Sequence, residues 1–97
     1  MATYISLGNF TEQGLRTIKD TTKRAAAVAE AARKFGVTVK GIYWTLGEYD
    51  LVTIVEAADP AQLTAFRLEV SRQGNVRGQT LTAFNADEMS AILSKLS

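Results

Sequence analysis

The segment from residue 42 to residue 56 constrains the fold most, because its apolar side chains occupy both odd and even positions. Its sequence is Ile-Tyr-Trp-Thr-Leu-Gly-Glu-Tyr-Asp-Leu-Val-Thr-Ile-Val-Glu, which predicts two strands joined by a Gly-Glu turn. A sheet with one face in water requires strands that alternate between apolar and polar residues. Here Tyr49, Leu51 and Val55 are expected on one face, and Val52 and Ile54 on the other. We therefore expect a sheet that is covered on both faces.

The composition limits the classes of function. Ninety-seven residues, 46% of them apolar and 22% charged, suit one globular domain spanning residues 1–97. Eleven basic and ten acidic residues are interspersed along the chain and leave a net charge of +1, so no nucleic-acid partner is expected. The chain has no cysteine and no histidine, which removes disulfides, thiolate nucleophiles and the commonest metal and haem ligands. We expect neither a metal nor a cofactor.

The chain also lacks the features of a membrane protein. The first residues, Met-Ala-Thr-Tyr-Ile-Ser-Leu-Gly, have no basic region followed by a long apolar stretch, so no signal peptide is predicted. No apolar run approaches the roughly 20 residues that span a bilayer. No helix combines a large apolar face with a lysine-rich one. We expect a cytoplasmic protein without a membrane partner.

Three helices are predicted from apolar spacing and capping residues. The first follows Asp20, has its apolar stripe at Ala25, Val28, Ala29, Ala32 and Phe35, and ends at Gly36. The second begins at Asp59-Pro60 and has its stripe at Leu63, Phe66 and Val70. The third, in a C-terminal helical extension of residues 86–97, follows a capping box formed by Asn85 and Glu88 and has its stripe at Met89, Ile92, Leu93 and Leu96.

Four strands are predicted at residues 3–9, 37–46, 49–57 and 76–84. In the second strand, strict alternation places Val37, Val39 and Tyr43 on one face, and Ile42, Trp44 and Leu46 on the other. The order is strand–helix–strand, strand–helix–strand, then the short C-terminal helix. This order predicts an α+β, ferredoxin-like βαββαβ fold, with a four-stranded antiparallel sheet and two helices on one face. The second apolar face then predicts a homodimer that stacks sheet on sheet. The C-terminal helix folding across that face is the alternative.

Several separated motifs resemble the GYD-domain family. They are Tyr4-Ile-Ser-Leu-Gly-Asn-Phe-Thr-Glu-Gln-Gly14, Arg24, Tyr43-Trp-Thr-Leu-Gly-Glu-Tyr-Asp50 and Gly74-Asn-Val-Arg77. The Gly-Tyr-Asp signature of the family is present here as Gly47-Glu48-Tyr49-Asp50, with one residue inserted after the glycine. The resemblance spans about residues 3–84 and implies a protomer of the dimeric α/β-barrel superfamily. It implies no particular activity, because relatives in that superfamily include cofactor-independent monooxygenases, isomerase-like enzymes and ligand-sensing domains.

The candidate functional residues are aromatic or charged. The rings of Tyr43 and Tyr49 suit the wall of a ligand pocket, or the packing of a core or dimer interface. Asp50, beside these rings, could act as a base or could instead cap the turn and pair with an arginine. Arg24 and Arg77 could hold a carboxylate or carbonyl of a ligand, or form surface salt bridges.

Three hypotheses on function follow. The first is a homodimer that binds a small organic ligand in a pocket between sheet and helices, lined by Arg24, Tyr43, Tyr49, Asp50 and Arg77. The second is a cofactor-independent monooxygenase or isomerase-like enzyme, in which Asp50 or Tyr43 moves a proton. The third is a structural assembly unit in which the sheet and C-terminal helix build oligomers. An RNA-binding module of the same topology is rejected, because the third strand offers Tyr49, Leu51 and Thr53 where such modules display alternating aromatic residues, and because the net charge is near neutral.

Overall fold

The computed structural model describes all 97 residues. Its four strands are β1 (Ala2–Phe10), β2 (Val37–Trp44), β3 (Leu51–Ala57) and β4 (Val76–Ala83). Its α-helices are α1 (Glu12–Arg16), α2 (Thr21–Ala32), α3 (Pro60–Arg72) and α4 (Ala86–Leu93), and short 3-10 turns cover Ile18–Asp20 and Arg33–Phe35. No helix is both long enough and apolar enough to cross a membrane.

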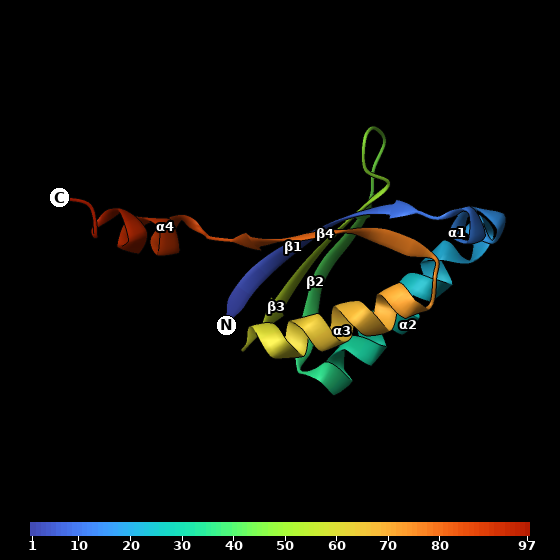
Figure 1. The fold of residues 1–97 in the computed structure, drawn as a ribbon, viewed down its shortest axis with the longest axis horizontal. Helices are drawn as coiled ribbons and strands as arrows, with labels where there is room; N and C mark the ends of the chain where they lie inside the picture. The colour runs from blue at the N-terminus through green and yellow to red at the C-terminus, as the bar shows by residue number, and fades with distance from the viewer.

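The strands form one antiparallel sheet in the order β2-β3-β1-β4. The helices α2 and α3 lie together on one side of this sheet, as Figure 1 shows. The predicted ferredoxin-like fold is therefore confirmed. No helix covers the other side of the sheet, which we call the open face.

The helix boundaries follow from the residues that cap them. Asp59 accepts hydrogen bonds through its Oδ1 atom from the backbone N–H groups of Ala61 and Gln62, at 2.7 and 3.1 Å, and Pro60 occupies the first helical position. Gly36 ends the turn after α2 with a left-handed φ of 73°. Both predicted boundaries are therefore confirmed.

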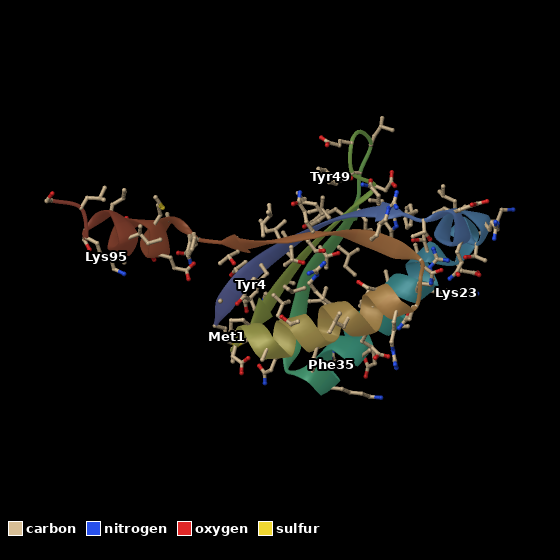
Figure 2. All side chains as sticks on the ribbon, in the orientation of Figure 1. Met1, Tyr4, Lys23, Phe35, Tyr49 and Lys95 are labelled. Carbon is tan, nitrogen blue, oxygen red and sulfur yellow. The ribbon has the colours of Figure 1, made fainter.

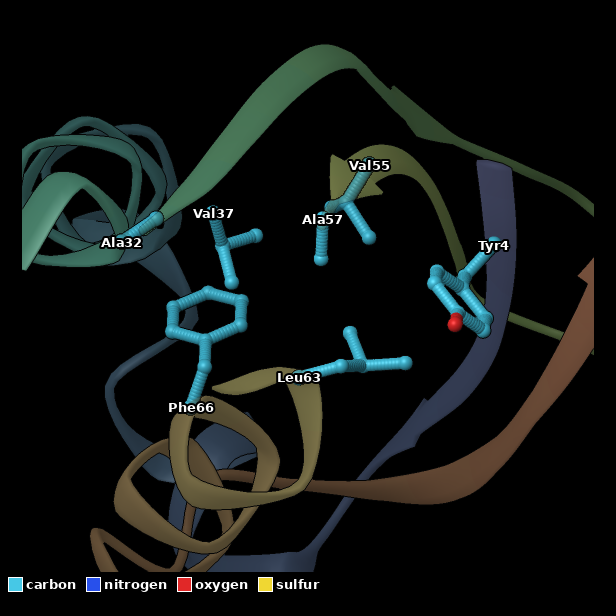
Figure 3. Packing of buried hydrophobic residues seen from close by; sticks show 7 residues of the cluster. All are labelled: Tyr4, Ala32, Val37, Val55, Ala57, Leu63 and Phe66. Atoms are coloured by element: carbon cyan, nitrogen blue, oxygen red, sulfur yellow. The ribbon is translucent and has the colours of Figure 1, made fainter. Parts of the chain in front are cut away.

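The hydrophobic core lies between the sheet and the two helices (Figure 3). Leu63 and Phe66 of α3 are buried against the sheet, and the Phe66 ring lies 6.1 Å from that of Phe35, between ring centroids. These contacts bury the stripe predicted for the second helix. The complete set of buried apolar residues is Tyr4, Ala32, Val37, Val55, Ala57, Leu63 and Phe66.

A β-bulge in β2 changes the face on which its last residues lie. The pairing of β2 with β3 shifts between Val39 and Gly41, so one extra residue is inserted in β2. Beyond the bulge, Ile42 pairs with Thr53 on the helix side and Tyr43 pairs with Val52 on the open face. The predicted grouping of Tyr43 with Val37 and Val39 is wrong, because strict alternation does not hold across a bulge.

The connection between β2 and β3 is longer than the predicted two-residue turn. Residues 45–50 form a six-residue loop that projects on the side opposite to α2 and α3 (Figure 1). Asp50 holds the base of this loop: its N–H donates to the carbonyl of Gly8 at 2.9 Å, its carbonyl accepts from the N–H of Thr45 at 2.9 Å, and its Oδ2 accepts from the N–H of Phe10 at 3.0 Å. Gly47 turns the loop with a φ of 126°.

The helix α4 lies apart from the rest of the molecule, beyond the end of β4 (Figure 1). Its predicted capping box is present: the N–H of Glu88 donates to the Asn85 side chain at 2.8 Å, and the N–H of Asn85 donates to the Glu88 side chain at 2.9 Å. The alternative in which this helix folds across the open face of its own sheet is not observed.

Candidate functional site

Apolar side chains gather at the centre of the open face. Strand pairing places Ile5 directly opposite Ile54 on one side and opposite Leu81 on the other. One step along the strands on the same face, Leu7 pairs with Val52, which in turn pairs with Tyr43. We call these six residues the open-face cluster: Ile5, Leu7, Tyr43, Val52, Ile54 and Leu81. No helix of the chain covers them, so the predicted second apolar face is present.

The family-like motifs, which are far apart in the sequence, meet at one end of the sheet. Thr11 caps α1 and joins it to the turn before β4: its N–H donates to the Asn75 carbonyl at 3.0 Å, and its hydroxyl donates to the Gly74 carbonyl at 2.6 Å. The amide nitrogen of Gln13 donates to Asn75 Oδ1 at 3.0 Å. Gly14 packs so closely on the Asn75 backbone that a Cβ atom has no space there. The segments of residues 11–14 and 74–75, each of which contains a glycine, are thus joined by hydrogen bonds and by close backbone packing.

Arg24 and Trp44 connect the start of α2 to the same end of the sheet. The Arg24 guanidinium donates to the Thr17 carbonyl at 2.8 Å and to the Gly14 carbonyl at 3.3 Å. The indole N–H of Trp44 donates to the Thr21 hydroxyl at 3.0 Å. Arg24 is therefore held in a fixed position by backbone carbonyl oxygens rather than by a carboxylate.

A cavity of about 120 Å3 lies between the sheet and the two helices. It has room for a small organic molecule, since a single water needs roughly 10–15 Å3. Apolar side chains from both layers line it, including Leu51, Leu63 and Phe66. The ionisable side chains on the helix side of the sheet are Arg24 and Arg67, with no aspartate or glutamate among the lining residues. Arg77 also borders the cavity, but its place in β4 puts its side chain on the open face, as for Leu81.

Three hydroxyl groups cross the floor of this cavity in one row. Ser6 of β1 pairs with Thr53 of β3 on one side and with Thr80 of β4 on the other, and all three line the cavity. Directly paired residues on neighbouring strands lie about 5 Å apart. The Thr80 hydroxyl is buried and has no hydrogen-bond partner. Such an unpaired group is costly inside a protein, so the row offers hydrogen bonds that the chain itself leaves unused.

The structure separates the five residues that the sequence analysis placed in one pocket. Arg24 and Arg77 line the cavity, whereas Tyr43, Tyr49 and Asp50 do not. The prediction that Tyr49 shares a face with Leu51 and Val55 is wrong, because residues 45–50 leave the strand. Tyr49 lies on the open-face side (Figure 2), where its hydroxyl accepts a hydrogen bond from Gln79 at 3.1 Å. Asp50 is bonded to the end of β1. The sequence analysis missed the row of hydroxyls, because serine and threonine at inward strand positions resemble ordinary strand formers.

The fold and this surface define the chain as a small ferredoxin-like protein with one uncovered sheet face. The GYD domain model matches residues 4–93, and the chain belongs to the GYD domain family. This confirms the resemblance of the motifs.

Named relatives cover almost the whole chain. One is the glutamine synthetase and cystathionine beta-lyase binding protein of Thermus thermophilus, which is 36% identical over 94 residues and matches across 96% of this chain and 99% of its own length. The crystal structure of TTHA0845, also from Thermus thermophilus, has a TM-score of 0.56 and 28% identity, over 89% of this chain and 96% of that one. The structure of FFRP-DM1 has a TM-score of 0.61 and 26% identity, over 87% of this chain and all of that one.

Proposed function

We propose that this protein binds a small organic anion with an apolar body in the cavity between its sheet and helices. The observation behind the proposal is the row of hydroxyls at Ser6, Thr53 and Thr80, which ends in the unpartnered, buried Thr80 oxygen. An apolar body suits the aliphatic and aromatic lining, and a ligand hydroxyl or carbonyl can pair with the row. Arg24 and Arg67, with no carboxylate among the lining residues, favour a negatively charged group.

The test uses the purified protein and two matched variants. Native mass spectrometry of the freshly purified chain detects a retained molecule as a mass above that of the polypeptide. Thr80→Val removes the unpartnered hydroxyl while keeping the shape of the side chain, and Thr82→Val makes the same change at an exposed position further along β4. We expect loss of the bound molecule in the first variant only. Equal retention of the molecule by both variants contradicts the proposal. The proposal is also wrong if the protein binds no member of a panel of aliphatic and aromatic carboxylates.

We propose in addition that the protein pairs with a second copy through the open face. Ile5, Ile54 and Leu81 lie side by side there without a helix above them. Apolar patches of this kind on a small protein usually mark an interaction surface. A twofold pair covers the same patch on both copies at once. Sedimentation equilibrium measures the pairing: a charged residue at position 54 should abolish it, and a pairing constant unchanged by Ile54→Lys contradicts it.

A second candidate function is the binding of other proteins. It is favoured by the 36% identical Thermus relative, which is named for binding glutamine synthetase and cystathionine beta-lyase. The projecting loop of residues 45–50 offers a contact for such a partner, because Leu46 at its tip is fully exposed. Biolayer interferometry tests the idea by measuring the binding of this chain to the glutamine synthetase and the cystathionine beta-lyase of Thermus thermophilus. We expect Leu46→Asp to weaken the binding, and Leu68→Asp, the same change at an exposed position of α3, to leave it unchanged. No binding by the unmodified chain contradicts the idea.

The catalytic roles of Asp50 and Tyr43 stay predictions. Neither side chain lines the cavity, so an enzyme acting there through these groups needs a different arrangement of the hairpin. Turnover of an identified ligand with a bell-shaped pH profile that Asp50→Asn removes is the result that supports this role. Turnover that is insensitive to Asp50→Asn counts against it.

A further inference from the structure

The helix α4 has an apolar stripe that no part of its own chain covers. Met89 is 43% exposed, Leu93 is 51% exposed and Leu96, just after the helix, is 72% exposed. A helix of eight residues is marginal in water, since isolated helices need about 12–15 residues even with good helix formers. Helices in proteins gain most of their stability by packing such a stripe against another surface. The stripe therefore requires a partner.

The connection to β4 holds α4 away from its own sheet. Only Phe84 and Asn85 separate the last residue of β4 from the first of α4, and Asn85 has an extended backbone with φ −77° and ψ 179°. The capping box fixes this direction, because Asn85 and Glu88 bond reciprocally. The molecule consequently measures 53 Å along its longest axis and 31 and 18 Å along the others. A partner for the stripe must come from another molecule.

The open face lies next to the C-terminal arm, which we define as residues 84–97. Leu81 and Ala83 lie at alternate positions on the open-face side of β4, and the arm begins at the next residue, the exposed Phe84. A molecule that rests on the open face next to Leu81 is thus also next to the base of the arm.

The area of the open face also argues for the arm. The four strands, of seven to nine residues each, give a flat footprint of roughly 500 Å2, from about 3.3 Å per residue and about 4.8 Å between strands. A stable protein pair buries about 800 Å2 on each partner. The open face alone falls short of this area. The arm supplies further apolar surface from Phe84, Met89, Ile92, Leu93 and Leu96.

We propose that the arm clasps the second copy of this chain that rests on the open face, so that each α4 packs its apolar stripe on the other copy. This inference rests on the proposed pairing through the open face, and it adds the part of the interface that the arm contributes. Twofold symmetry makes the clasp reciprocal, and each pair therefore buries two arms.

The first experiment compares two substitutions on opposite sides of α4 by sedimentation equilibrium. Leu93→Asp places a charge in the stripe, whereas Ala91→Asp places the same charge on the side away from it. We expect the first to raise the dissociation constant of the pair at least tenfold and the second to change it less than twofold. A chain that ends at Phe84 should weaken the pair at least as much as Leu93→Asp, with the far-ultraviolet circular dichroism of the sheet retained.

The second experiment asks whether the stripe touches the second copy. The chain has no cysteine, so Leu96→Cys carries the only thiol and can be labelled with a benzophenone maleimide. We expect a photoproduct with twice the mass of the chain. Products of single-chain mass, or no product, overturn the inference.

The outcomes also distinguish a failure of the proposed clasp by the arm from a failure of the proposed pairing through the open face. If Ile54→Lys dissociates the pair while Leu93→Asp does not, the pairing through the open face stands and the clasp is wrong. If the unmodified chain is a monomer, the pairing itself is wrong, and the clasp falls with it.

Discussion

The two faces of the sheet differ in how their apolar side chains are covered. On the helix side, Val37 and Val55 are buried beneath α2 and α3. On the open face, Ile54 and Leu81 have the same aliphatic character and the same strand spacing, but no element of the chain lies above them. Apolar side chains with a similar sequence pattern are thus covered by the chain's own helices on one face, whereas on the other face only another molecule can cover them.

This difference predicts two kinds of stability. Contacts on the helix side form whenever one chain folds, so their contribution does not depend on protein concentration. Contacts on the open face form only when another molecule binds, so their contribution rises with concentration. The substitutions below are expected to separate the two.

The largest effect is expected in the core on the helix side. Phe66→Ala should lower the free energy of unfolding by about 3–5 kcal/mol, because it leaves a cavity beneath α3 beside Leu63 and Phe35. Leu68→Ala on the same helix is the control, since Leu68 is 64% exposed and should change the stability by less than about 0.5 kcal/mol. Urea unfolding measures both. Equal losses in the two variants contradict the assignment of this face as the core.

A charge at the centre of the open face should act on association instead of on folding. Ile54→Lys should weaken the pair by about a hundredfold or more, because two unpaired ammonium groups are buried in a twofold interface. The isolated chain should keep its sheet signal in circular dichroism. Leu68→Lys makes the same kind of change on α3, on the other side of the sheet, where Leu68 is 64% exposed; it is the matched control. A large loss of stability at concentrations where the chain is monomeric argues that Ile54 belongs to the internal core.

The Asp50 side chain should stabilise the end of the sheet at which the GYD-family motifs lie, because it bonds to the end of β1. Asp50→Ala removes the acceptor of the Phe10 N–H and leaves that donor unpaired, which costs about 1–3 kcal/mol. Glu48→Ala, in the same loop, should change the free energy of unfolding by less than about 0.5 kcal/mol. Thermal unfolding compares the two variants; an equally small effect at both positions shows that the carboxylate does not hold the loop.

The smallest effect on stability is expected in the row of hydroxyls. Thr80→Val replaces a buried hydroxyl without a partner by a methyl group, so the free energy of unfolding should stay constant or rise by about 1 kcal/mol. Urea unfolding of the ligand-free protein gives this value. A loss of more than about 1 kcal/mol shows that the hydroxyl has a partner in the folded chain.

The element order and the helix boundaries could be predicted from the sequence because local rules decide them. Asp59-Pro60 and the capping box at Asn85 act within one turn of helix. The two apolar faces of β3 could be predicted for the same reason, since alternation holds without interruption from Leu51 to Ala57. The resemblance of the motifs to the GYD domain family also predicted the fold of the whole chain.

The remaining features depend on contacts between distant segments. The bulge in β2 moved Tyr43 to the open face, and its local sign, a glycine inside a strand at position 41, does not say on which side of it the register shifts. Asp50 bonds to Phe10, 40 residues earlier in the sequence, so the length of the hairpin loop could not be deduced from the loop itself. The row formed by Ser6, Thr53 and Thr80 exists only because strand register aligns them. For that reason the pocket predicted from the aromatic residues differs from the cavity in the structure.

Sedimentation equilibrium of the unmodified chain, from micromolar to millimolar concentration, tests most directly whether the open face is completed by a second copy. We predict a species of at least twice the 10.5 kDa chain mass that dissociates only on dilution. A mass of 10.5 kDa across the whole range contradicts the account, because the open-face cluster then remains in water.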